Sequence, residues 1–103
     1  MAEGHAGCDE RLARYEAEAE AGDPQAFFAL GLIYATGRMV EADPVAAHMW
    51  FNLAALHGHA EAAEERRLLA DELTPAEIAR AQRLAREWLE THRNAPAAMA
   101  RAA

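Results

Sequence analysis

The stretch Gly22–Gly37, "GDPQAFFALGLIYATG", decides the fold. It opens with an Asp-Pro pair, which is typical of a helix start because aspartate caps free N–H groups and proline needs no donor in the first turn. It closes at Gly37, and glycine commonly follows the last turn of a helix. Gly31 stands near its middle, where glycine costs about 1 kcal/mol relative to alanine. We therefore expect a helix whose centre must lack a side chain.

Two helices of similar design are expected on either side of this one. The segment "ERLARYEAEAEA" follows Asp9, a residue suited to capping its start, and stops at Gly22. After a short connector, Asp43 and Pro44 repeat the Asp-Pro start and open a helix that ends near Gly58. The same pair of signals therefore begins two successive helices.

Two more helices complete the predicted domain. One runs from about Ala60 to about Glu72, and Thr74 and Glu77 then form a capping box that starts another, which reaches about His92. Connections this short force neighbouring helices to run antiparallel. We expect residues 9–92 to form one all-α domain, with a disordered arm at residues 1–8 and a disordered, alanine-rich tail at residues 93–103.

Composition limits the classes of function. The chain has 103 residues and a formal net charge of −7, from 17 acidic and 10 basic residues, all of the latter arginine. An acidic surface repels phosphates, so we expect no nucleic-acid partner and no membrane partner. With one cysteine, Cys8, no intramolecular disulfide can form, and no secretory signal or membrane span is evident. These features favour a cytoplasmic protein, or a periplasmic one if a signal peptide has been removed.

An internal repeat is visible at an offset of 36 residues. Three pairs match at this spacing: Gly22 with Gly58, Ala26 with Ala62, and Ala19 with Ala55. Periods of this length belong to solenoids of helix pairs. The match fails at Leu30 and Gly31, which align with Arg66 and Arg67.

Residues 22–62 resemble the Sel-one-like repeat, a relative of the tetratricopeptide repeat. The residues that carry the resemblance are Gly22, Ala26, Leu30, Gly31, Tyr34, Gly37, Val40, Asp43, Ala47, Trp50, Ala54, Ala55, Gly58 and Ala62. Met39 departs from the motif, because the family usually has a second glycine there. The resemblance implies an antiparallel helix-pair solenoid: a half repeat (9–21), a full repeat (22–58), a degenerate helix (59–73) and a C-terminal capping helix (74–92).

Gly31 has a physical explanation in such a fold. Together with the alanines, it would let the antiparallel helices approach until backbone meets backbone, and this packing would offset the cost of the glycine. We expect Trp50, Phe51, Ala54 and Ala55 to supply the facing surface.

The resemblance also implies a binding face, because related repeats hold peptides on the inner face of the first helix of each pair. The corresponding residues, called the inner strip below, are Phe28, Leu32, Ala35, Thr36, Glu64, Leu68, Asp71 and Glu72. An apolar strip bordered by acids suits a partner segment with apolar anchors and basic flanks. This predicts a non-catalytic scaffold or adaptor, unless the fifth helix covers the strip.

A structural homo-oligomer is the second hypothesis. The fifth helix has an apolar stripe formed by Ile78, Ala81, Ala85, Trp88 and Leu89. If part of this stripe stayed exposed at the end of a short array, it would attract a second copy of the chain. Charging Trp88 or Leu89 would then produce monomers.

Metal and enzyme chemistry are not expected. His57 and His59 form an H-x-H turn, and the chain also has His5, His48, His92 and Cys8, but this is not the set of four closely spaced ligands of a structural zinc site. The sequence has no serine and no glycine-rich phosphate loop. We interpret the carboxylates of Glu64, Glu65, Asp71 and Glu72 as solvated or partner-facing charge. The prediction is therefore no enzyme, no metal and no cofactor.

Overall fold

The computed structural model describes the backbone of residues 2–92 and the side chains of residues 9–92. Within that range the chain is all-helical, with helices α1 (Ala2–Glu20), α2 (Pro24–Thr36), α3 (Pro44–Leu56), α4 (Ala60–Ala70) and α5 (Pro75–His92). The predicted all-α class is confirmed for this part of the chain. The expected tail at residues 93–103 lies outside the described residues.

The helix starts predicted from capping residues are formed. The side chain of Asp23 accepts a hydrogen bond from the Gln25 N–H at 3.0 Å, which caps α2. Asp43 accepts one from the Ala46 N–H at 3.1 Å and caps α3. Each cap satisfies a donor that the first turn leaves without a helical partner.

The capping box before α5 is also complete. Thr74 Oγ1 accepts from the Glu77 N–H at 3.1 Å, and Glu77 Oε1 accepts from the Thr74 N–H at 2.8 Å. This reciprocal pair is the arrangement that the Thr-x-x-Glu spacing predicts.

The turns before α2 and α4 have nearly the same backbone conformation. Gly22 has a φ of 90° and Gly58 a φ of 91°, a left-handed conformation that residues with a Cβ avoid. These two glycines are the pair aligned by the 36-residue offset, so the internal repeat has a conformational counterpart.

Helix α1 begins earlier than the sequence predicted. Its first residue is Ala2, so Asp9 lies inside the helix and does not cap it, and most of the segment expected as a disordered arm is helical. Adding turns to an existing helix is much easier than nucleating one, because each further residue adds a hydrogen bond. A capping residue alone therefore did not determine where α1 starts.

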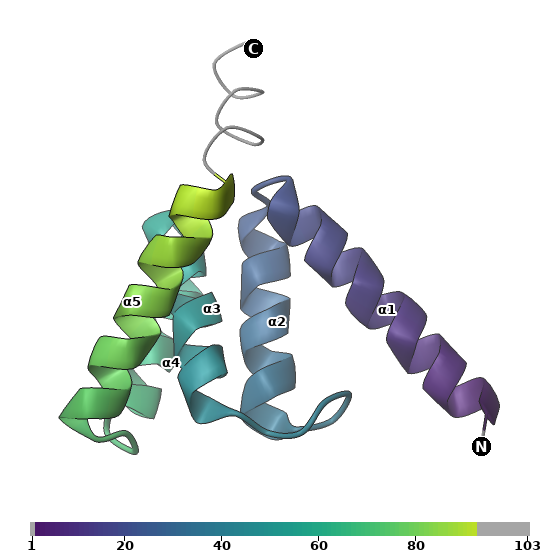
Figure 1. The fold of residues 1–103 in the computed structure, drawn as a ribbon, viewed down its shortest axis with the longest axis horizontal. Helices are drawn as coiled ribbons and strands as arrows, with labels where there is room; N and C mark the ends of the chain where they lie inside the picture. The colour runs from purple at the N-terminus through teal and green to yellow at the C-terminus, as the bar shows by residue number, and fades with distance from the viewer. Residues whose placement is uncertain (1, 93–103) are drawn as a thin grey trace, which may run out of the picture.

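Helix α3 is the centre of the domain. It packs against α2, α4 and α5, while α1 packs on α2. Figure 1 shows α1 meeting α2 near the turn that joins them and diverging from it toward the N-terminus. The four largest fully buried side chains all belong to the α2–α3 pair: Phe27, Leu30, Phe51 and Leu53. This pair is thus the main source of apolar burial.

Gly31 makes room for a ring and not for a backbone. A Cβ placed on Gly31 would overlap the phenyl ring of Phe51, which is buried. The expected close approach of α2 and α3 therefore exists, but the expected backbone-to-backbone contact at Gly31 is wrong. Phe51 uses the space because its ring is flat enough to lie against the bare helix surface.

Candidate functional site

The inner strip contains two of the most exposed large apolar side chains in the described part of the chain. Leu32 on α2 is 38% exposed and Leu68 on α4 is 47% exposed. Ala35, Thr36, Asp71 and Glu72 are exposed as well. Most side chains of the inner strip are therefore exposed to solvent.

Phe28 differs from the other members of the strip because it is half-buried. Its ring stacks on the imidazole of His59, with centroids 4.4 Å apart, and lies 5.9 Å from the ring of Phe51. Phe28 thus links α2 to the residue that precedes α4. Part of its ring surface is therefore used for packing within the domain.

His59 forms the junction between the two segments of the strip. Its Nδ1 accepts a hydrogen bond from the Ala62 N–H at 3.1 Å, which caps α4. Its Nε2 donates to Gln25 Oε1 at 2.7 Å. A neutral imidazole with the proton on Nε2 satisfies both contacts. These bonds hold the start of α4 beside the start of α2.

His57, the other histidine of the H-x-H turn, also has a structural role. Its Nδ1 donates to the Leu53 carbonyl at 2.7 Å, and its ring lies 4.9 Å from the ring of Phe27. Among the described side chains, no group of three or more histidine, cysteine or carboxylate residues could hold a metal ion.

The polar members of the strip have mostly local contacts. Thr36 Oγ1 donates to the Leu32 carbonyl at 2.8 Å. Glu64 forms an ion pair with Arg67 one turn later, and the hydrogen bond from this guanidinium lowers the pKa of the Glu64 carboxyl. Both side chains are solvent-exposed, so the pair contributes little to stability.

Helix α5 leaves the two strip leucines open. It packs on α3, and Leu32 and Leu68 stay exposed. The predicted apolar stripe of α5 faces inward: Ala81 and Ala85 are buried, and Trp88 packs edge-on against Phe27 with centroids 5.2 Å apart. Leu89 is half-buried against the same core. The residues assigned to self-association therefore have partners within the chain.

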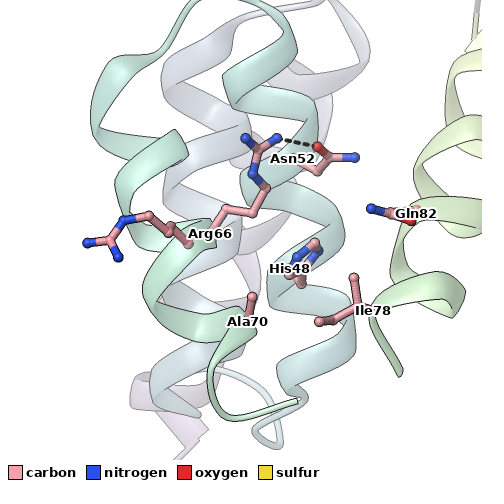
Figure 2. Close-up of a pocket in the computed structure, with 7 residues that line it drawn as sticks. His48, Asn52, Arg66, Ala70, Ile78 and Gln82 are labelled. Carbon is pink, nitrogen blue, oxygen red and sulfur yellow. Dashed lines mark hydrogen bonds between the residues drawn. The ribbon is translucent and has the colours of Figure 1, made fainter. Parts of the chain in front are cut away.

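A pocket that the sequence did not predict lies between α3, α4 and α5. It has a volume of about 390 Å³ and is lined by His48, Asn52, Arg66, Arg67, Ala70, Ile78 and Gln82. Figure 2 shows side chains of all three helices converging on it. The sequence feature that could have indicated this pocket is the mismatch of the repeat at Arg66 and Arg67. We interpreted it only as a degenerate copy of the repeat.

His48 forms part of the wall of this pocket and is only 3% exposed. Burial, and then the positive charge of Arg66, lower the pKa of its imidazole. Both effects penalise the charged form, so the ring is neutral at physiological pH.

None of the helices in the described part of the chain combines the length and the apolar character that crossing a membrane requires. Comparisons with models of protein families, with curated proteins and with solved structures found no match. The resemblance to Sel-one-like repeats therefore rests on the sequence motif alone.

Proposed function

We propose that this chain is a non-catalytic scaffold that binds a segment of another protein through the inner strip. The observation that carries the proposal is the exposure of Leu32 and Leu68, at 38% and 47%, on helices that both pack against α3. Apolar side chains in a patch with a polar rim are typical of protein-binding surfaces. Because Phe28 is held by His59, the two leucines are the main anchors.

The charge around the strip defines the partner. Glu64, Asp71 and Glu72 lie on the α4 side, and the chain as a whole carries −7. Complementarity then favours a partner segment with apolar anchors and lysine or arginine flanks. The acidic rim mainly raises the association rate and excludes acidic competitors.

The proposed architecture is a fragment of a helix-pair solenoid closed by α5. Three paired features support it at the 36-residue offset: the turn glycines Gly22 and Gly58, the buried alanines Ala26 and Ala62, and the caps Asp23 and His59. Such solenoids are built from a repeated structural unit that packs against its neighbours.

Self-association through α5 is the less favoured alternative. Trp88 contacts Phe27, Trp50 and His92, so a charge at this position would disrupt the core before it tested an interface. Leu56, which is 61% exposed at the end of α3, is a better position at which to test for dimers.

The test uses a fluorescein-labelled amphipathic peptide with leucines on one helical face and lysines on the other. Fluorescence anisotropy should show saturable binding. The double variant Leu32→Ser with Leu68→Ser should weaken it by about ten-fold or more, since removing two central apolar anchors costs roughly 1.4 kcal/mol or more.

Two controls make the experiment specific. Leu56→Ser removes a still more exposed leucine outside the strip and should leave the affinity unchanged. A peptide with glutamates in place of the lysines should bind at least several-fold more weakly. Equal binding by the strip variant and the unmodified protein would refute the proposal.

A further inference from the structure

The pocket between α3, α4 and α5 is separate from the inner strip. His48 and Asn52 come from α3, Arg66 and Ala70 from α4, and Ile78 and Gln82 from α5. At about 390 Å³ it falls in the size range of small-molecule sites. Five of its seven lining side chains can form hydrogen bonds and two are apolar, so it is more polar than most small-molecule sites and suits a ligand with a polar or charged group.

His48 supplies the first indication of a ligand. Its Nδ1 is buried and has no hydrogen-bond partner, and it is the one such side-chain atom among the described residues. Burying a polar nitrogen without a partner costs free energy, so native structures rarely keep one without a reason. This atom has no access to the pocket, so it marks incomplete hydrogen bonding in the pocket wall and is not itself a contact of the ligand.

Arg66 supplies the second indication of a ligand. It is half-buried, and none of the carboxylates in residues 9–92 lies within ion-pair distance of it. Its one hydrogen bond goes from Nη1 to Asn52 Oδ1, at 2.6 Å, as Figure 2 shows. A guanidinium has five N–H donors. In an acidic protein, a partly buried arginine thus keeps most of its donors available.

The remaining polar groups complete a donor-rich wall. The bond from Arg66 occupies the oxygen of the Asn52 amide and leaves its NH₂ group as a donor. Figure 2 shows the amide of Gln82 extending from α5 toward Asn52 and His48 on α3. An oxygen acceptor placed between these helices would meet donors from α3, α4 and α5.

We propose that this pocket binds the carboxylate of a small aliphatic monocarboxylic acid, with Arg66 as the charged anchor, Asn52 and Gln82 as neutral donors, and Ala70 and Ile78 against the alkyl chain. The planar fork of a guanidinium matches a carboxylate and binds it with two parallel hydrogen bonds.

The charge balance selects a monoanion. Arg67, the other arginine in the wall, is exposed and already paired with Glu64, so Arg66 is the one cation there without a carboxylate among the described residues. His48 is neutral, since burial and Arg66 lower its pKa. A phosphate dianion would bring a second negative charge with no cation to balance it, into a protein of net charge −7.

The test is a titration of the ¹⁵N-labelled protein with sodium hexanoate, followed by amide and imidazole shifts and run against sodium chloride at equal ionic strength. Saturable shifts should centre on His48, Asn52 and Gln82, with an affinity in the millimolar range for so small a ligand. Sodium phosphate should produce shifts at least several-fold weaker.

Variants separate the pocket from general charge effects. Arg66→Met should weaken hexanoate binding by about ten-fold or more, since it removes a charged hydrogen-bond donor. Gln82→Leu, an exposed change that leaves Arg66 in place, should weaken it several-fold, and Arg83→Met, which removes an exposed charge outside the pocket, should not. Circular dichroism confirms that each variant keeps its helices.

Two outcomes would overturn the assignment. One is an absence of saturable shifts at the pocket residues, or equal binding by Arg66→Met and Arg83→Met. The other is binding of a peptide that ends in isoleucine with a free carboxylate, but not of hexanoate or of the amidated peptide, which would make the ligand the C-terminus of a partner protein.

Discussion

Helices α2 and α4 occupy equivalent places in the internal repeat, yet they meet α3 in opposite ways. Both start at a side-chain cap, Asp23 or His59, and both bury an alanine one turn later. On the following turn α2 buries Leu30 and Gly31. The aligned residues of α4 are Arg66, which is half-buried, and Arg67, which is exposed.

The comparison shows that caps and small residues determine where each helix begins and how it lies. The two residues on the following turn, Leu30 and Gly31 in α2 or Arg66 and Arg67 in α4, then determine whether its contact with α3 is apolar or polar. At Gly31 the missing side chain admits the ring of Phe51 and closes the contact. At the α4 contact the long side chain of Arg66 reaches Asn52 and borders a pocket. The same repeated helix therefore forms a closed apolar contact with α3 when it is α2 and borders a polar pocket when it is α4.

The largest expected effects come from changes at the apolar contact between Gly31 of α2 and Phe51 of α3. Gly31→Leu should reduce the free energy of unfolding by about 1–3 kcal/mol, because the new side chain overlaps the buried ring of Phe51. The aligned change in α4, Arg67→Leu, should have a much smaller effect, because Arg67 is exposed. Urea unfolding followed by circular dichroism measures both.

A double-mutant cycle sharpens this test. Phe51→Ala alone should cost about 3–5 kcal/mol, as expected for a buried phenylalanine. If the ring is what Gly31 accommodates, Gly31→Leu should cost less in the Phe51→Ala background than in the unmodified protein. Additive effects would contradict the assigned contact.

The features predicted correctly from sequence are those set by local chemistry. The Asp23, Asp43 and Thr74–Glu77 caps and the turn glycines are short-range signals, since a side chain satisfies a backbone group two or three residues away. Leu32 and Leu68 are exposed, as binding would require, and the strip itself stays a prediction.

The features that sequence reasoning missed depend on contacts between distant residues. Nothing local indicates that Phe51 would fill the space at Gly31, or that His48, Arg66 and Gln82 from three helices would border one pocket. The stacking of Phe28 on His59 is another such contact. Local patterns specify segments, and side-chain packing between segments then determines the sites.

An intermediate effect is expected from the two aligned caps. Asp23→Ala should cost about 1 kcal/mol of the free energy of unfolding, the usual value for a lost N-cap. His59→Ala should cost at least as much, because it removes the cap of α4, the stack on Phe28 and the bond to Gln25. Thermal and urea unfolding provide the measurement.

His59→Asn separates these contributions. Asparagine is a good N-cap, so His59→Asn should restore the part of the free energy of unfolding that comes from capping α4. It lacks an aromatic ring, so the part that comes from stacking on Phe28 should stay lost. If His59→Asn were as unstable as His59→Ala, the Nδ1 cap would not matter, and the parallel between Asp23 and His59 would fail.

The smallest expected effect is a pH dependence that belongs to the α4 side alone. Burial and Arg66 lower the pKa of His48 in the folded state below the ordinary value of 6.5. As the pH falls through that value, His48 is protonated in the unfolded chain but not in the folded chain, so the free energy of unfolding decreases. Above it both states are neutral, and His48 contributes no slope.

His48→Leu removes this titration and should flatten the fall in stability between about pH 7.5 and about pH 5.5 relative to the unmodified protein. The groups that line the pocket with His48 include Arg66 and the Glu64-paired Arg67 from α4, and the uncharged Ile78 and Gln82 from α5. Arg66→Met should therefore reduce the slope without abolishing it, since burial is the larger cause. Gly31→Leu, on the α2 side, should lower stability equally at both pH values. An unchanged slope in His48→Leu would show that the other histidines cause the pH dependence and that the buried imidazole does not.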